Sequence, residues 1–207
     1  GAADLAGLAA FAEERGVGLI VDEIYHGLHY GDPPAQGVVH APGSIIINSF
    51  SKYFGMTGWR LGWMVMPAEW VPVAEKLMQN LFISASTPAQ HAALACFGDE
   101  ARAIFESRRA AFRQRRDFLL PALRELGFHI PGHPDGAFYL YADVSGLTDD
   151  SAELAEALLD RAGVAATPGL DFEQTAPERH MRFAYTTAME RLEAGVERIA
   201  QLLRAGG

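Results

Sequence analysis

The chain has 207 residues, 49% of them hydrophobic, and a formal net charge of −9. This length allows one large or two small domains with a substantial core, and the negative charge argues against nucleic acid or an anionic membrane surface as a main partner. A single cysteine, Cys96, excludes an intramolecular disulfide and fits a reducing compartment, so we expect a cytoplasmic protein. The histidines show no metal-ligand spacing, so we expect no metal site.

The first hundred residues predict alternating helices and strands, which is typical of an α/β fold with a mainly parallel sheet. Apolar runs predict strands at residues 17–22, 44–48 and 61–66. Helices are expected at 2–15, 68–81 and 86–97. In the second of these helices, the side expected to be buried carries Trp70, Val73, Leu77 and Leu81.

A long charged helix is predicted over residues 100–126, with a kink or restart at Pro121. Its many arginines allow two interpretations, a nucleic-acid-binding face or a solvated face with local ion pairs. Interspersed acidic residues favour the second interpretation. The arginines are Arg102, Arg108, Arg109, Arg113, Arg115, Arg116 and Arg124.

Beyond this helix the pattern predicts a small α+β domain. Helices are expected at residues 151–161 and from 187 onward, and short strands at 128–130, 136–143, 164–167 and 181–185.

Two hydroxyls and a lysine follow the strand at 44–48, in the order Ser49, Ser51, Lys52, and Arg60 lies eight residues beyond the lysine. A lysine amine can form a Schiff base with a carbonyl cofactor. Hydroxyl and guanidinium groups are suitable donors to a phosphate. The combination indicates pyridoxal phosphate, an aldehyde that carries a phosphate. The alternative is a solvated lysine in a glycine-rich loop.

Acidic residues end the strand at 17–22, where Asp22 and Glu23 are followed by Tyr25. Ligands sit at the carboxyl ends of parallel strands, so Asp22 and Lys52 are expected to face one crevice. A carboxylate near the ring nitrogen of pyridoxal phosphate keeps it protonated. Because side chains alternate along a strand, only one of the two acids can take this role, and we assign it to Asp22.

These motifs resemble the class I/II aminotransferases of pyridoxal-phosphate fold type I. The resemblance covers nearly the whole chain. It rests on Asp22-Glu23-Ile24-Tyr25, Ser49-Phe50-Ser51-Lys52 and Gly58-Trp59-Arg60-Leu61-Gly62.

The resemblance implies a C-terminal portion of such an enzyme. Residues 1–98 would belong to the large cofactor-binding domain, 99–127 to an interdomain helix and 128–207 to the small domain. It also implies a homodimer that transfers an amino group between an amino acid and a 2-oxo acid.

The resemblance assigns roles residue by residue. Lys52 would carry the cofactor and act as the base, Asp22 would pair with the ring nitrogen, and Tyr25 would donate to the ring oxygen. The phosphate would be held by Ser49, Ser51 and Arg60.

Arg182 lies between apolar residues in the strand at 181–185. From the sequence alone it either points to solvent on an edge strand or holds a buried anion, and the edge interpretation is favoured. The resemblance reverses this preference, because the family's arginine at this position grips the substrate's α-carboxylate.

Other functions of the same fold stay open at this point. One alternative is a β-lyase or a cyclopropane-carboxylate synthase. Another is the aminotransferase-like sensor half of a transcription regulator. The α-oxoamine synthases are set aside, because they carry Asp-Glu-Ala-His where this chain has Asp22-Glu23-Ile24-Tyr25.

Overall fold

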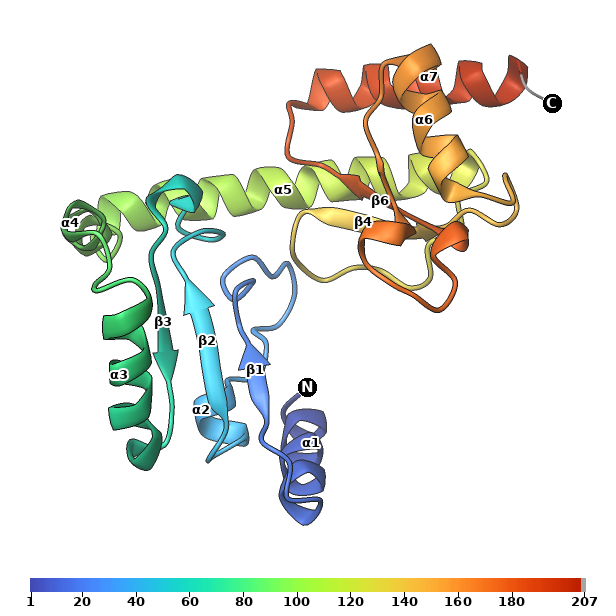
Figure 1. The fold of residues 1–207 in the computed structure, drawn as a ribbon. Coiled ribbons are helices and arrows are strands. Elements are labelled where there is room, and N and C mark those ends of the chain that lie inside the picture. The colour runs from blue at the N-terminus through green and yellow to red at the C-terminus, as the bar shows by residue number, and fades with distance from the viewer. Residues whose placement is uncertain (206–207) are drawn as a thin grey trace. The chain divides into compact units, whose positions relative to one another are not determined.

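The computed structural model describes residues 1–205 and is mixed α/β (Figure 1). It contains two compact units, Gly1–Arg109 and Ala110–Gly207. The division falls within the long helix α5 (Asp99–Glu125), and each unit has its own three-stranded sheet. No helix in the described part is both long and apolar enough to cross a bilayer.

The sheet of the first unit has the order β1-β2-β3, with β1 at Ile20–Asp22, β2 at Ile45–Ser49 and β3 at Gly62–Val65 (Figure 1). The helices of this unit are α1 (Ala2–Glu14), α2 (Gly37–His40), α3 (Val71–Leu81) and α4 (Thr87–Ala95), with short 3₁₀ turns at Thr57–Trp59 and Ala68–Trp70.

The expectation of a mainly parallel sheet is not confirmed for this unit. β1 pairs with β2 in parallel, with Asp22 opposite Ile47, whereas β2 and β3 are antiparallel, with Ser49 opposite Gly62. A parallel pair needs a crossover of a dozen or more residues, and the segment containing α2 supplies it between β1 and β2. Residues 50–61, between β2 and β3, contain a tight turn and the 3₁₀ turn at Thr57–Trp59 in place of a crossover helix, and they return the chain antiparallel to β2.

The predicted burial in the first unit is wrong for α3 and its flanking turn. Leu81 is 74% exposed, and no described element covers the apolar side of this helix. The helical spacing identified which side chains share a face but not whether another element covers that face. Large apolar side chains of β3, of α3 and of the turn before α3 are exposed to solvent, and we refer to them together as the exposed apolar surface. Its members include Trp63, Met64, Val65, Trp70, Val73, Leu77 and Leu81.

Helix α5 is continuous, so the predicted restart at Pro121 is wrong. An interior proline removes a backbone hydrogen bond and disfavours the helix. Buried leucines on either side hold the helix by packing at this point, namely Leu119, Leu120 and Leu123.

Several arginines of α5 contact groups of their own unit, and two of them form the local ion pairs that were predicted. Arg102 lies 4.0 Å from Asp99, and Arg109 pairs with Glu106. Further along, Arg124 donates a hydrogen bond of 2.7 Å to the carbonyl of Ile130.

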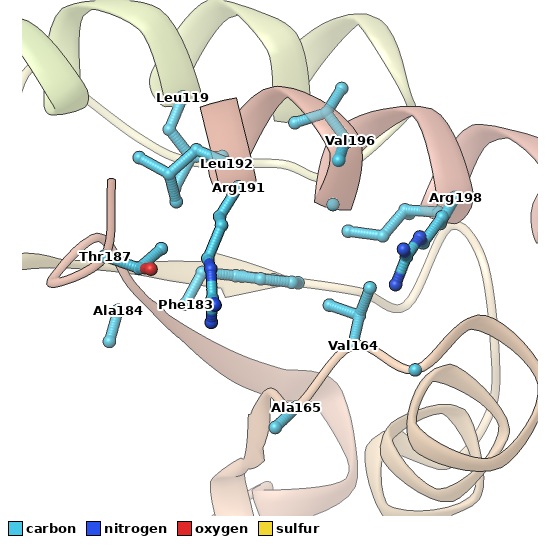
Figure 2. A pocket seen from close by; sticks show the side chains of 14 residues that line it. Leu119, Val164, Ala165, Phe183, Ala184, Thr187, Arg191, Leu192, Val196 and Arg198 are labelled. Atoms are coloured by element: carbon cyan, nitrogen blue, oxygen red, sulfur yellow. The ribbon is translucent and has the colours of Figure 1, made fainter. Parts of the chain in front are cut away.

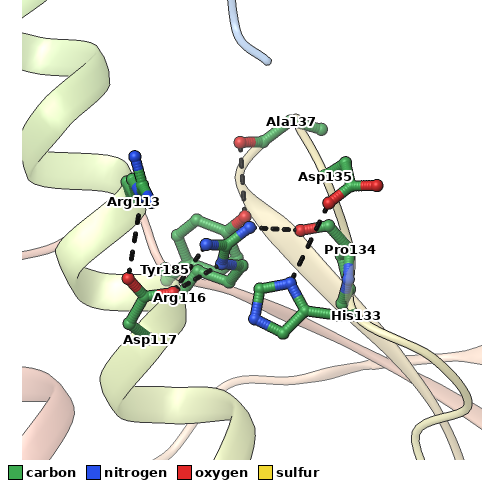
Figure 3. Close-up of polar contacts among 8 residues, drawn as sticks. All are labelled: Arg113, Arg116, Asp117, His133, Pro134, Asp135, Ala137 and Tyr185. Atoms are coloured by element: carbon green, nitrogen blue, oxygen red, sulfur yellow. Dashed lines mark hydrogen bonds and ion pairs between the residues drawn. The ribbon is translucent and has the colours of Figure 1, made fainter. Parts of the chain in front are cut away.

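Arg116 departs from the predicted solvated face, because its side chain is only 3% exposed. Its Nη1 donates to the carbonyl oxygen of Pro134 at 2.5 Å, and its Nε donates to Asp117 at 2.8 Å (Figure 3). Nearby, the Tyr185 hydroxyl donates to the carbonyl of Ala137 at 3.3 Å. These contacts fix the segment before β4 against α5.

The second unit contains an antiparallel sheet of order β4-β6-β5. The strands are β4 (Tyr139–Asp143), β5 (Thr167–Pro168) and β6 (His180–Ala184). The helices are α6 (Ser151–Ala162) and α7 (Met189–Ala205), with 3₁₀ turns η3 (Gly169–Asp171) and η4 (Pro177–Arg179). Three predicted strands are shorter than expected, and for the one predicted at 136–143 only residues 139–143 form β4. Residues 164–166 lie outside β5, and the segment at 128–130 forms only an isolated bridge between His129 and Asp143.

The two faces of this sheet differ in character, as strand alternation requires. The inner face carries Leu140, Ala142, Met181 and Phe183, all at most 5% exposed. The opposite face carries the polar and aromatic residues Tyr139, Tyr141, His180 and Arg182.

We predict that Arg116→Ala lowers the free energy of unfolding by about 2 kcal/mol, because it removes buried hydrogen bonds and packing. Arg113→Ala is the matched control, since Arg113 also lies beside Asp117 but is 60% exposed and 3.9 Å away. Its effect should stay within about 0.5 kcal/mol. Urea unfolding followed by circular dichroism measures both, and equal losses would contradict the structural role of Arg116.

Candidate active site

The two acids at the end of β1 have different surroundings. The Glu23 carboxylate is buried, accepts the Gly37 backbone N–H at 2.6 Å and lies 3.4 Å from His26 Nδ1. The Asp22 side chain is exposed and accepts only the backbone N–H of Ile24, at 3.0 Å, among the bonds of the described residues. Glu23 therefore holds the loop after β1 in place, while Asp22 keeps an oxygen available for a ligand.

Lys52 lies in a tight turn directly after β2. The turn closes through bonds from the Gly55 N–H to the Lys52 carbonyl at 3.1 Å and from the Met56 N–H to the Phe50 carbonyl at 2.9 Å. Phe50 and Met56 are buried in one apolar cluster, which anchors both ends of the turn. The half-buried Lys52 has its Nζ 5.7 Å from the centroid of the Tyr25 ring.

Lys52 and Asp22 thus lie at the same end of the sheet, where β1 and β2 have their carboxyl ends. Asp22 ends β1, Lys52 follows β2, and the two strands are neighbours that run parallel. A ligand at the carboxyl ends of these strands would meet a carboxylate, an amine and an aromatic ring.

The predicted phosphate ligands share one loop through a chain of hydrogen bonds. Ser49 Oγ accepts the Ser51 N–H at 3.1 Å, and the Ser51 carbonyl accepts the Thr57 hydroxyl at 2.6 Å. Arg60, whose φ of 54° is in the left-handed region, donates to the Thr57 carbonyl at 2.9 Å. Thr57 was not predicted to contribute, although it connects the serine and arginine ends of the loop.

Tyr53 holds the turn that contains Lys52, residues 50–56 (the lysine turn), against the loop after β1. Gly27 has a φ of 90°, and a Cβ at this position would lie 2.5 Å from Cγ of the Tyr53 ring. The Tyr53 hydroxyl donates to Glu106 on α5 at 2.7 Å. Burial and this carboxylate raise the pKa of Tyr53 to about 12, so the phenol stays a neutral donor. This contact is not predictable from the sequence, because its partners are far apart in the chain.

Arg109 and His29 form a second contact between α5 and the loop after β1. Arg109, which pairs with Glu106, lies 3.4 Å from Nε2 of His29 in the loop after β1. Burial, followed by the positive charge of Arg109, lowers the pKa of His29, which favours the neutral imidazole. The lysine turn, the loop and α5 are thereby joined within the first unit.

Arg182 lies in the second unit on β6, the central strand of its sheet, so the edge-strand interpretation is wrong. Its guanidinium carbon is 4.2 Å from the ring centroid of Phe172 and 5.3 Å from that of Tyr139. Its Nε is buried without a hydrogen-bond partner, and no carboxylate of the described residues lies within ion-pair distance. The aromatic rings contact the faces of the guanidinium, and its donors remain available to an anion.

These groups fit pyridoxal phosphate by their chemistry. Lys52 supplies an amine for the aldehyde and Asp22 supplies an anionic oxygen for the ring nitrogen. Hydroxyl and guanidinium donors for the phosphate stand on the loop that contains Ser49, Ser51 and Arg60.

The second unit also has a cavity of about 620 Å³ beside α7, shown in Figure 2. Phe183, Leu192 and Val164 form apolar parts of its wall, and Arg191 and Arg198 reach it from α7. None of the predicted site residues lines it, so cavity size alone does not locate the chemistry.

Known proteins that are similar to this chain include a protein family and individual enzymes of the same kind. Residues 2–199 match the family described as aminotransferase class I and II. The valine–pyruvate aminotransferase of Mycobacterium tuberculosis is 36% identical, over 97% of this chain and 52% of its own. The aspartate/prephenate aminotransferase of Thermus thermophilus is 38% identical, over 96% and 51%. The chain therefore spans about half the length of these curated relatives.

Solved structures agree with this result. A crystal structure of an aminotransferase from Mycobacterium tuberculosis superposes with a TM-score of 0.91 at 37% identity, covering 97% of this chain and 52% of that one. The aromatic aminotransferase from Pyrococcus horikoshii gives a TM-score of 0.90 at 31% identity, covering 98% and 55%.

We predict that Gly27→Ala lowers the free energy of unfolding by about 2 to 4 kcal/mol, because the methyl group meets Tyr53 and the backbone is left-handed. The control is Gly31→Ala in the same loop, which meets nothing within 4 Å and should change stability by less than about 0.5 kcal/mol. Tryptophan fluorescence during urea unfolding reports on this unit. An unchanged Gly27→Ala midpoint would show that Tyr53 does not fix the loop.

Proposed function

The chain belongs to the class I and II aminotransferase family, and we propose that it forms the C-terminal portion of a pyridoxal-phosphate-dependent aminotransferase. The observation that carries this proposal is the placement of Lys52 and Asp22 at the carboxyl ends of neighbouring parallel strands. The reaction moves an amino group from an amino acid to a 2-oxo acid.

The proposed roles are those that the resemblance to the family implies, and the chemistry of each group is suited to its role. Bound pyridoxal phosphate would supply an electron sink for electrons released at the substrate's Cα. Lys52 Nζ would be the nucleophile for the aldehyde and afterwards the base that accepts the Cα proton. Asp22 would pair with the ring nitrogen and keep its proton in place, and the Tyr25 hydroxyl would donate to the ring oxygen.

The remaining site residues are assigned to binding the cofactor's phosphate and the substrate. Ser49, Ser51 and Arg60 would hold the phosphate through hydroxyl and guanidinium donors. Arg182 would bind the substrate's α-carboxylate with two parallel hydrogen bonds and so restrict how the substrate can turn.

The exposed apolar surface of the first unit supports a proposal about assembly. Large apolar side chains of β3 and α3, which the strand and helix patterns predict to be buried, are exposed to solvent. The curated relatives are about twice as long as the chain. We propose that activity requires the N-terminal half found in family members, which would cover this surface, and that the complete enzyme is a cytoplasmic homodimer of amino acid metabolism. Without that half, water would weaken the ionic contacts of the site.

The alternatives are not favoured. The relatives named above are aminotransferases, whereas a β-lyase, a cyclopropane-carboxylate synthase or the sensor half of a transcription regulator would be expected to resemble proteins with those names.

The first test concerns Lys52. In an enzyme completed with the N-terminal half of a family member, Lys52→Ala should remove the visible absorption of the bound cofactor and lower amino transfer by about a thousandfold or more. The 207-residue chain alone should be nearly inactive in the same assay. Turnover by Lys52→Ala close to that of the unaltered enzyme would refute the assignment, and full activity of the chain alone would refute the assembly.

The second test separates the two acids. Asp22→Asn keeps the shape but removes the charge, so the protein should fold normally while turnover falls by about a hundredfold or more. Glu23→Gln can still accept the Gly37 N–H, so it should retain turnover and lose only some thermal stability. Steady-state rates and melting temperatures of both variants provide the comparison. The reverse pattern would assign the ring nitrogen to Glu23.

A further inference from the structure

A compact segment connects β5 to β6 and lies against the face of the sheet that carries Arg182. It spans residues 169–179 and begins and ends in the short turns η3 and η4. Gly169 packs against the carbonyl oxygen of Pro177, so the two ends of the segment meet. Segments closed in this way are frequently functional.

Glu173, in the middle of this segment, contacts two strands through one carboxylate oxygen. The Tyr141 hydroxyl of β4 donates to Glu173 Oε1 at 2.6 Å, and His180 Nδ1 of β6 lies 2.6 Å from the same oxygen. The Tyr141 and His180 rings are themselves stacked, with centroids 5.2 Å apart and planes at 14°. Burial and the Glu173 carboxylate raise the pKa of Tyr141 to about 12, so its hydroxyl remains a donor.

Phe172, the neighbour of Glu173, is the ring that lies over Arg182. Its centroid is 4.2 Å from the guanidinium carbon and 6.2 Å from the Tyr141 ring, which it meets edge-on. A guanidinium that is stacked on rings keeps its N–H edge free for a carboxylate. The position of Phe172 therefore controls which side of Arg182 an anion can reach.

We propose that Glu173 is a positioning residue for Arg182: by accepting the Tyr141 hydroxyl and lying against His180, it holds Phe172 on the guanidinium as a latch and directs the guanidinium's free edge toward the carboxylate of the substrate. The link to the substrate rests on the function proposed above for Arg182. The latch itself concerns only contacts within the second unit.

Other contacts hold the end of the segment independently of Glu173. Arg179 Nη2 donates to Asp143 at 2.8 Å, and the Ser151 hydroxyl donates to the Pro177 carbonyl at 2.9 Å. Loss of the Glu173 contacts should therefore release Phe172 without unfolding the segment. This separates the proposed role from a general contribution to stability.

The test measures how fast phenylglyoxal, an arginine-specific reagent, modifies Arg182 in the 207-residue chain, with each arginine quantified by peptide mass spectrometry. Glu173→Ala should raise the rate at Arg182 about fivefold, the factor that corresponds to losing roughly 1 kcal/mol of latch stability. Phe172→Ala should give a similar increase. The double variant should add nothing further, because both changes remove the same cover. The exposed Arg161 provides a reference rate within each sample.

Matched variants make the result specific. Glu178→Ala removes an exposed glutamate of the same segment and should leave the Arg182 rate unchanged. Glu173→Gln keeps an acceptor for the Tyr141 hydroxyl and should restore part of the protection. If Glu173→Ala does not fold, Tyr141→Phe removes one of the two contacts and should raise the rate about twofold.

An unchanged Arg182 rate in folded Glu173→Ala, or an equal increase in Glu178→Ala, would overturn the latch. The measurement requires neither cofactor nor turnover. Its failure is therefore distinguishable from failure of the proposed amino transfer, which the Lys52 variant tests.

Discussion

The close approach of the Tyr53 ring to the backbone of Gly27 is the contact on which the candidate site depends. Tyr53 directly follows Lys52, and Gly27 lies in the loop that follows Asp22 and Tyr25. A residue with a side chain at position 27 would push these two segments apart. The parallel pairing of β1 with β2 brings Asp22 and the Lys52 turn to the same end of the sheet, and the contact between Tyr53 and Gly27 holds the two following loops together there.

The two units differ in how far they bury their apolar side chains. In the second unit the sheet has a closed apolar face, and Arg182 stands on the other face among aromatic rings. In the first unit the sheet and α3 leave large apolar side chains exposed. The site's chemistry is therefore present in the chain, while the desolvation that would strengthen its charged contacts depends on surfaces that the described residues leave uncovered.

The features that depend on local order were predictable from the sequence. The helices and most strands followed from periodicity, and the order and spacing of Asp22, Lys52 and Arg60 along the chain indicated the chemistry. Contacts between distant segments were not predictable. The antiparallel β3, the exposed side of α3, the burial of Arg116 and the bond from Tyr53 to Glu106 all depend on which elements meet in space. Periodicity along one segment does not show which other segments it contacts.

The most direct test of the account uses the fact that Lys52 and Lys76 are the only lysines in the sequence. Borohydride converts an imine between a lysine amine and pyridoxal phosphate into a stable amine that peptide mass spectrometry can locate. At one equivalent of pyridoxal phosphate, the account predicts labelling of Lys52 in clear excess over Lys76, which is exposed on α3. Equal labelling of the two lysines, or preferential labelling of Lys76, would contradict the claim that this fold builds its cofactor site around Lys52.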